Sequence, residues 1–357
     1  MVVLYRLVED DESLKKAVSF WEKEKVLGLD FEMENNLHRY GTHLALIQVS
    51  DGRKTWLVDP LKVKDLRPFI KFMENPRIQK IMHDYEFDFM VLHEKLNCHP
   101  KNVFDTKIAA ELDGRKEFGL GSLLEELFSV EKDSKMQKVD WTRRPMTERM
   151  KTYAAKDVIY LIRLRDILKK SLIDKGRELW FKEEFMLLEK IKFEKKTECH
   201  LIKGSMTMTG CERAVLHTLF DCREKIAEET DRPAYHVIPN KRLLELVKDT
   251  PRTPDDWRKM KGVSWLVKKN ANSFANAVRR GMEMPEEGKE RLLKPRMSSA
   301  KFDYLKEERN RLGGLLEVQP YIIMSTNQME ELARGEAPKK ILKEWQQKVL
   351  NAHGIKL

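Results

Sequence analysis

Four carboxylates and one tyrosine lie where the surrounding pattern favours apolar residues: Asp30, Glu32, Asp88, Tyr153 and Asp157. A buried carboxylate needs a partner, because removing its charge from water is costly. Carboxylates without an accompanying Cys or His cluster are hard oxygen ligands, which favour Mg²⁺ or Mn²⁺ over zinc. Two such ions about 3.5–4 Å apart can stabilise both the attacking and the leaving oxygen at phosphorus. The set therefore predicts a two-metal site for hydrolysing phosphodiester bonds.

The first two carboxylates fall in a predicted strand. Residues 26–34 are mostly apolar and β-favouring, and the side chains of a strand alternate between its faces. Leu29 and Phe31 therefore share one face, while Asp30 and Glu32 project side by side from the other.

The other three site residues fall in predicted helices. In residues 83–96 the helical stripe of Tyr85, Phe89, Leu92 and Leu96 takes in Asp88. In residues 147–170 the stripe of Met150, Ala154, Val158 and Leu161 takes in Tyr153 and Asp157, which are four residues apart and so stack on one face. The tyrosine hydroxyl, both donor and acceptor, could orient an attacking water.

Each piece alone also has a structural interpretation. An Asp-x-Glu pair occurs by chance in many chains. An inward Asp on a helix can be a cap or an ion-pair partner, and a Tyr in an apolar stripe can belong to the core. The order of the elements, a strand pair followed by two helices, favours the catalytic interpretation.

Four sequence blocks between residues 27 and 164 carry a family resemblance. They are Leu29-Asp-Phe-Glu with His43-Leu-Ala-Leu-Ile-Gln-Val; Lys80-Ile-Met-His-Asp-Tyr-Glu-Phe-Asp88; Phe104-Asp-Thr-Lys-Ile-Ala-Ala110; and Asp140-Trp-Thr-Arg-Arg-Pro-Met-Thr147 followed by Tyr153-Ala-Ala-Lys-Asp157. This stretch resembles the ribonuclease D family of 3′-to-5′ exonucleases, the tyrosine-bearing branch of the DEDD superfamily.

The resemblance implies a fold and a role for each site residue. The fold is an α/β ribonuclease-H-like domain with a mixed sheet flanked by helices, followed by all-α modules. Asp30, Glu32 and Asp157 would ligate one metal, Asp30 and Asp88 would serve the second, and Tyr153 would position the nucleophile. Asp105 also matches a family position; the alternative is a helix N-cap. Asp84, beside the second motif, is expected to face solvent.

The C-terminal half is predicted to be helical and basic. Residues 200–357 hold 30 Lys and Arg against 22 Asp and Glu, which is +8 of the chain's net +10. A helix is expected over 211–228 with Val215, Leu219, Cys222 and Ile226 buried, Asn240 is expected to cap a helix over 241–248, and Gly313-Gly314 is expected to form a turn. Arg232-Pro, the segment 237–244 and Met260-Lys-Gly-Val263 resemble an HRDC domain. The clusters Arg258-Lys259, Lys261, Lys268-Lys269 and Arg279-Arg280 are the expected phosphate contacts, although solvated helix faces look the same.

The predicted domains are an exonuclease domain at 1–172, a helical linker at 173–207, an HRDC domain at 208–285 and a second HRDC-like domain at 296–357. A helical stretch over 161–196, broken at Gly176, is expected to link domains. Four scattered cysteines suggest neither a zinc site nor a disulfide framework. No secretory signal or membrane span is apparent, so a cytoplasmic protein is expected. The protein is also expected to be a monomer.

The resemblance implies metal-dependent trimming of RNA from its single-stranded 3′ end, with release of nucleoside 5′-monophosphates. Its substrates would include transfer-RNA precursors and other small structured RNAs. Two alternatives remain open. One is a 3′-to-5′ DNA exonuclease of the same superfamily, since the motifs do not read the 2′-hydroxyl. The other is a non-catalytic RNA-binding scaffold.

Overall fold

The computed structural model describes residues 4–191, 199, 202–284 and 295–357. Contacts divide the chain into two compact units. The first, the sheet unit, comprises Met1–Glu32, Leu44–Phe193 and Leu293–Leu357. The second, the helical unit, comprises Met33–His43 and Glu194–Leu292. Within the described residues, no helix has the length and apolar character that a membrane span requires.

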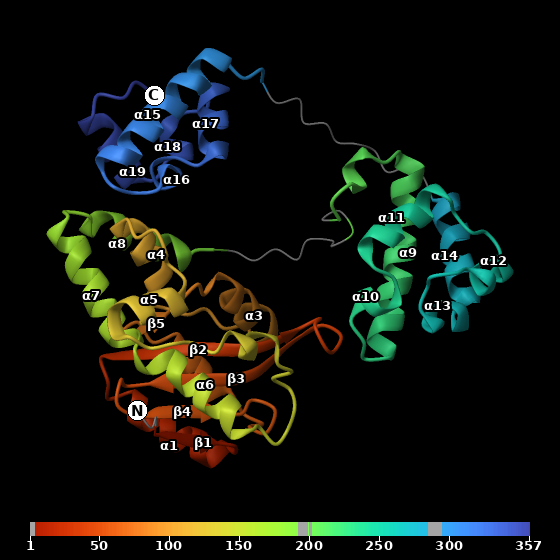
Figure 1. Cartoon of the computed structure of the whole chain (residues 1–357), viewed down its shortest axis with the longest axis horizontal. Helices are drawn as coiled ribbons and strands as arrows, with labels where there is room; N and C mark the ends of the chain where they lie inside the picture. Colours follow the sequence, from red (N-terminus) through yellow and green to blue (C-terminus); the bar gives the residue numbers. More distant parts are fainter. Residues whose placement is uncertain (1–3, 192–198, 200–201, 285–294) are drawn as a thin grey trace. The chain divides into compact units, whose positions relative to one another are not determined.

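A mixed six-stranded sheet forms the centre of the sheet unit, in the order β1-β4-β3-β2-β5-β6 (Figure 1). The β1–β4, β2–β5 and β5–β6 pairs are parallel, whereas β3 and β4 are antiparallel. The strands are β1 (Tyr5–Val8), β2 (Val26–Asn35), β3 (Thr42–Ser50), β4 (Thr55–Val58), β5 (Gln79–Met82) and β6 (Val103–Asp105). This sheet and its flanking helices confirm the predicted α/β architecture.

Helices cover the sheet, and two of them carry the predicted site residues Asp88, Tyr153 and Asp157. They are α1 (Asp11–Trp21), α2 (Arg67–Met73), α3 (Glu86–Leu96), α4 (Thr106–Asp113), α5 (Leu120–Phe128), α6 (Glu148–Ile159), α7 (Leu161–Asp174) and α8 (Glu178–Leu188), with a short 3₁₀ turn at Ser134–Lys138. The helix expected over 147–170 is thus two consecutive helices that meet at Tyr160. The expected break at Gly176 is confirmed, because this residue has φ +70° between α7 and α8. The end of the expected stretch, residues 192–196, lies outside the described residues.

The C-terminal helices α15 (Ser299–Leu315), α16 (Pro320–Ile323), α17 (Thr326–Ala333), α18 (Pro338–Ile341) and α19 (Glu344–Ala352) belong to the sheet unit and share its apolar core. Trp345 of α19 stacks on Trp180 of α8 with ring centroids 4.4 Å apart. Lys343 Nζ lies 2.6 Å from Glu184 Oε2. This segment is therefore packed into the unit that carries the sheet.

The expected turn at Gly313-Gly314 is wrong, because α15 runs through both glycines. A Cβ added at Gly313 would lie 3.1 Å from Pro320 Cα. The absence of a side chain there lets the start of α16 approach the helix closely. The boundary between the predicted domains at 208–285 and 296–357 falls largely on residues 285–294, outside the described part of the chain.

The helical unit contains α9 (Gly210–Glu229), α10 (Ala234–Val237), α11 (Asn240–Lys248), α12 (Pro254–Lys259), α13 (Trp265–Lys269) and α14 (Ala271–Glu283). The predicted stripe of α9 is buried, and a Thr209–Glu212 capping box begins the helix. Asn240 is the first residue of α11 and does not cap it; its Oδ1 accepts a hydrogen bond from Arg223 at 2.6 Å. The tip of the β2–β3 connection joins this unit, where Arg39 Nε donates to Asp231 at 2.8 Å.

Candidate active site

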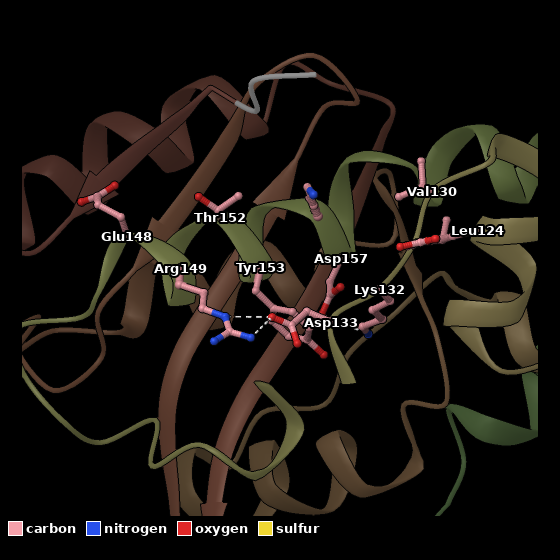
Figure 2. Close-up of a pocket in the computed structure, with 11 residues that line it drawn as sticks. Leu124, Val130, Lys132, Asp133, Glu148, Arg149, Thr152, Tyr153 and Asp157 are labelled. Carbon is pink, nitrogen blue, oxygen red and sulfur yellow. Dashed lines mark hydrogen bonds and ion pairs between the residues drawn. The ribbon is translucent and has the colours of Figure 1, made fainter. Parts of the chain in front are cut away.

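Strand β2 and helix α6 bring four of the predicted site residues together. On β2, Leu29 and Phe31 are buried while Asp30 and Glu32 are partly exposed on the other face, as the alternation predicts. On α6, Tyr153 and Asp157 lie four residues apart and point the same way (Figure 2). The sheet and the helix thus present their functional groups to a common volume.

Gly28 allows this close approach of helix and strand. A Cβ added there would lie 2.8 Å from the Val158 carbonyl oxygen and 3.1 Å from Leu161 Cβ. Distances below 3.0 Å to backbone are not tolerated without a shift of the neighbouring element. A glycine two residues before Asp30 therefore sets the distance between the carboxylates of β2 and Asp157 of α6.

Three of the carboxylates form a compact cluster. Asp30, Glu32 and Asp157 each place one oxygen so that all three lie within 4.8 Å of one another. Asp157 is only 1% exposed. Burial raises the pKa of Asp30 and of Glu32, and the neighbouring Asp30 and Asp157 raise that of Glu32 further. Burial, opposed by Lys132, raises the pKa of Asp157 to about 7. Such a cluster needs positive charge to be ionised at neutral pH.

Asp88 lies in the first turn of α3 and outside that three-oxygen cluster. Burial raises its pKa well above the usual range, and the charge of Asp30 adds to this effect. Asp30 therefore belongs to the three-carboxylate cluster and also interacts electrostatically with Asp88. The exposed Asp84 pairs instead with Lys107 at 2.9 Å, which confirms that it faces solvent.

Asp105 is the N-cap of α4, as the alternative interpretation of this residue predicted. Its Oδ1 accepts from the backbone N–H groups of Lys107 and Ile108 at 2.6 and 3.1 Å. Its Oδ2 accepts from the Tyr85 N–H at 3.1 Å, which ties the start of α3 to the start of α4. Asp105 thus supports the element that carries Asp88.

Lys132 is a site residue that the sequence did not indicate. Its Nζ lies 3.1 Å from Asp157 Oδ2 and 5.2 Å from the centre of the Tyr153 ring, and it favours ionisation of Asp30, Glu32 and Asp157. One ammonium faces three clustered carboxylates. Among the described residues, no donor reaches the buried Oδ1 of Asp157. The hard, under-neutralised oxygen set fits divalent cations.

The Asp140-Trp-Thr-Arg-Arg-Pro block packs against Tyr153. Trp141 is buried with its ring centroid 6.0 Å from that of Tyr153. Arg144 donates two hydrogen bonds to the buried Asp59 carboxylate, at 2.6 and 2.8 Å, and one to the Ala45 carbonyl at 2.7 Å. The block therefore anchors the segment before α6 to strands β3 and β4.

A cavity of about 320 Å³ opens beside the carboxylates (Figure 2). Tyr153 and Asp157 line it together with one residue of α5 and with residues of the α5–α6 connection and of α6: Leu124, Val130, Glu131, Lys132, Asp133, Glu148, Arg149, Thr152 and Lys156. Arg149 is held in place by Asp133, with Nε and Oδ2 2.8 Å apart. The cavity thus places the cationic side chains of Lys132, Arg149 and Lys156 close to the carboxylate cluster. Such side chains attract the end of a polyanionic chain.

Comparisons with known proteins define the class. Residues 5–173 match the model of the 3′-5′ exonuclease family, and residues 212–278 match that of the HRDC domain. The chain is 26% identical over 337 residues to ribonuclease D of Desulfotalea psychrophila, covering 91% of this chain and 90% of that relative. It is 30% identical over 261 residues to ribonuclease D of a Shewanella strain, covering 72% of this chain and 67% of that relative.

The fold agrees with these matches. The crystal structure of Escherichia coli RNase D superposes with a TM-score of 0.75 at 22% identity, covering 99% of this chain and 100% of that one. The protein is thus a 3′-to-5′ exonuclease that carries an HRDC domain. It belongs to the ribonuclease D family and is a 3′-to-5′ exoribonuclease.

Proposed function

We propose that this exoribonuclease shortens RNA from a single-stranded 3′ end by a two-metal-ion mechanism and releases nucleoside 5′-monophosphates. The observation that carries the proposal is the cluster of Asp30, Glu32 and Asp157 oxygens within 4.8 Å. A second observation supports it: the buried Oδ1 of Asp157 accepts no hydrogen bond from any of the described residues. Both features are expected of carboxylates arranged for cations rather than for hydrogen bonds.

Each carboxylate has a proposed role. Asp30, Glu32 and Asp157 hold one divalent cation, and Asp30 with Asp88 holds a second, in keeping with the interaction of Asp30 with both sides of the site. Mg²⁺ or Mn²⁺ bound there supplies Lewis-acid stabilisation of the attacking and leaving oxygens. Asp105, by capping α4 and accepting from the Tyr85 N–H, orients the first turn that carries Asp88.

Tyr153 orients the attacking water through its hydroxyl. Burial raises the phenol pKa, and the neighbouring Asp157, Glu32 and Asp30 raise it further, so the phenol stays protonated and can donate or accept. Packing against Trp141 restricts the position of the Tyr153 ring. Because the phenol keeps its proton, Tyr153 is a positioning group, not a base.

Transfer-RNA precursors and other small structured RNAs are the proposed substrates. The Escherichia coli neighbour is described as an exoribonuclease involved in structured RNA processing, and the surplus of cations beyond residue 200 suits such polyanions. The proposed divisions are an exonuclease domain at 1–172, a linker at 173–207, an HRDC domain at 208–285 and a second HRDC-like domain at 296–357. A cytoplasmic monomer is proposed as the working form.

Digestion of a 5′-labelled single-stranded RNA tests the proposal. With Mg²⁺ or Mn²⁺ we expect a ladder that shortens from the 3′ end and yields nucleoside 5′-monophosphates, and EDTA should abolish it. A DNA of matched sequence measures the preference for ribose. A ladder unaffected by EDTA would contradict the metal mechanism.

Three variants make the test specific. Asp157→Asn should lose nearly all activity, because it removes a cation ligand, whereas Asp84→Asn, a neighbouring exposed carboxylate, should be unaffected. Tyr153→Phe should lower kcat by about 10²-fold or more with little change in KM if the hydroxyl acts on the water. Equal loss in Asp84→Asn and Asp157→Asn would indicate a general effect of surface charge.

A further inference from the structure

Trp265 is an exposed tryptophan in the helical unit. The chain has seven tryptophans, and the other six are between 0% and 7% exposed. Trp265 is 58% exposed and is the first residue of α13. Its neighbours Leu266 and Val267 fill the core in its place. The packing of this unit therefore does not explain a large aromatic side chain at this position.

The sequence segment that contains Trp265 is cationic. Residues 258–280 contain seven Lys and Arg residues and no Asp or Glu. All seven side chains are exposed: Arg258, Lys259, Lys261, Lys268, Lys269, Arg279 and Arg280. Elsewhere in the described chain, exposed cations are commonly paired with a carboxylate three or four residues away. Arg258 forms such a pair with Asp255, just before the segment, at 2.8 Å. The segment itself holds no acid, so no ion pair can form between two of its own residues.

One cation of this segment lies against the Trp265 ring, and another joins two helices of the unit. Lys269 Nζ lies 5.6 Å from the centre of the Trp265 ring. Arg258, on the preceding helix, donates to Asn272 Oδ1 at 3.0 Å and so ties α12 to the start of α14. Among the ion pairs of the described residues, none involves Lys261, Lys268 or Lys269. These three ammonium groups are therefore available to phosphates.

We infer that Trp265 is a stacking platform for one base of single-stranded RNA, whose flanking phosphates are bound by Lys261, Lys268 and Lys269. Proteins that hold single strands combine aromatic side chains, on which bases stack, with cations along the backbone path. A protein partner would need complementary acids and an apolar surround, but only one large aromatic is exposed on α12–α14. The inference rests on the proposed RNA substrate and assigns to this face the binding of the RNA body.

Tryptophan fluorescence gives a selective readout. Since the other six indoles are buried, a stacked base should quench mainly Trp265. Titration with a single-stranded 20-nucleotide RNA in EDTA, where no cleavage occurs, should quench the exposed component of the emission. In Trp265→Phe this quenching should disappear while the RNA still binds by anisotropy. Emission of the wild-type protein that is unchanged at saturating RNA would overturn the inference.

Affinity and its salt dependence separate stacking from charge. Trp265→Ala should raise Kd by about 5- to 150-fold, the range of one base stack, without changing the slope of log Kd against log salt. Lys268→Glu with Lys269→Glu should weaken binding and reduce that slope by about 0.7 for each phosphate that the protein no longer neutralises. The matched control Lys225→Glu, an exposed lysine on α9, should change Kd much less. Equal effects of the control and the double variant would overturn the phosphate contacts.

Cleavage of a trinucleotide distinguishes this inference from the proposed function. Trp265→Ala should raise KM for the longer strand more than it raises KM for a trinucleotide, because only the longer strand offers a base beyond those at the site of cleavage. If neither the wild-type protein nor any variant cleaves either RNA with Mg²⁺ or Mn²⁺, the proposed chemistry fails. The binding measurements in EDTA would still show whether a base stacks on Trp265. A trinucleotide KM that rises as much as that of the longer strand would contradict a separate binding face.

Discussion

Replacing Asp157 by Asn should stabilise the cation-free protein while abolishing its activity. In the folded chain, burial raises the pKa of this carboxyl from 3.8 to about 7. The unfolded chain therefore releases the proton at a lower pH than the folded chain does. Well below pH 4 both states are protonated and Asp157 does not affect stability. As pH rises from about 4 to 7 the folded state is progressively disfavoured.

The magnitude follows from the two pKa values. A difference of about 3 between folded and unfolded pKa corresponds to about 4 kcal/mol of lost stability above pH 7, and to less than about half of that at pH 5. Asn cannot ionise and so escapes this cost. The amide leaves Lys132 without its partner at 3.1 Å, which offsets part of the gain. We therefore expect Asp157→Asn to be about 2–4 kcal/mol more stable than wild type at pH 8 in EDTA.

Urea unfolding in EDTA between pH 5 and pH 8 measures this difference. The gap between variant and wild type should widen as pH rises, and Mg²⁺ should then stabilise wild type more than the variant. Asp84→Asn, which changes an exposed carboxylate, should stay within about 0.5 kcal/mol of wild type throughout. A gap that is absent at pH 8, or constant over this range, would refute the account of Asp157 as a destabilised ligand.

Three further changes test other parts of the site. Lys132→Met should tighten Mn²⁺ binding in the absence of RNA by about tenfold, because the Lys132–Asp157 contact of about 1.5 kcal/mol no longer competes with the ion. Lys132→Arg keeps this contact and should not tighten Mn²⁺ binding. Isothermal titration measures both variants, and weaker Mn²⁺ binding by the Met variant would contradict the competition. Gly28→Ala should destabilise the protein by about 1–3 kcal/mol and lower kcat, because the added methyl meets the Val158 carbonyl at 2.8 Å; wild-type kcat and melting temperature would exclude this spacing role. Arg144→Ala should cost about 3–5 kcal/mol in urea unfolding because it leaves the Asp59 carboxylate buried and unpaired, and the double variant with Asp59→Asn should recover part of that loss.

The parts of the fold that follow from local periodicity could be predicted. Alternation along residues 26–34 separates Asp30 and Glu32 from Leu29 and Phe31, and the structure has that arrangement. Helical spacing likewise places Tyr153 and Asp157 on one buried face of α6. These predictions worked because one face of each element must be buried, which leaves a period in the sequence.

Features that depend on contacts far apart in the chain could not be predicted. Lys132 stands in a lysine-rich segment without periodicity, and only the fold brings it to Asp157, 25 residues on. Gly28 has no local signal, because the reason for a glycine there is the backbone of α6. The turn expected at Gly313-Gly314 failed for a similar reason: the helix continues through both glycines, and Gly313 accommodates the close approach of Pro320.

The packing of α15–α19 into the sheet unit bears on how the chain acquires its structure during synthesis. Leu305, Leu312, Trp345 and Leu350 belong to the same apolar cluster as Leu164, Leu168 and Trp180. Domains generally fold from the N-terminus as the ribosome releases them. Here the final helix leaves the ribosome after the whole helical unit has been made, so a chain cut short before residue 345 exposes the face of Trp180 that Trp345 covers. Premature termination near the 3′ end of the message should therefore yield an aggregation-prone product rather than a smaller nuclease.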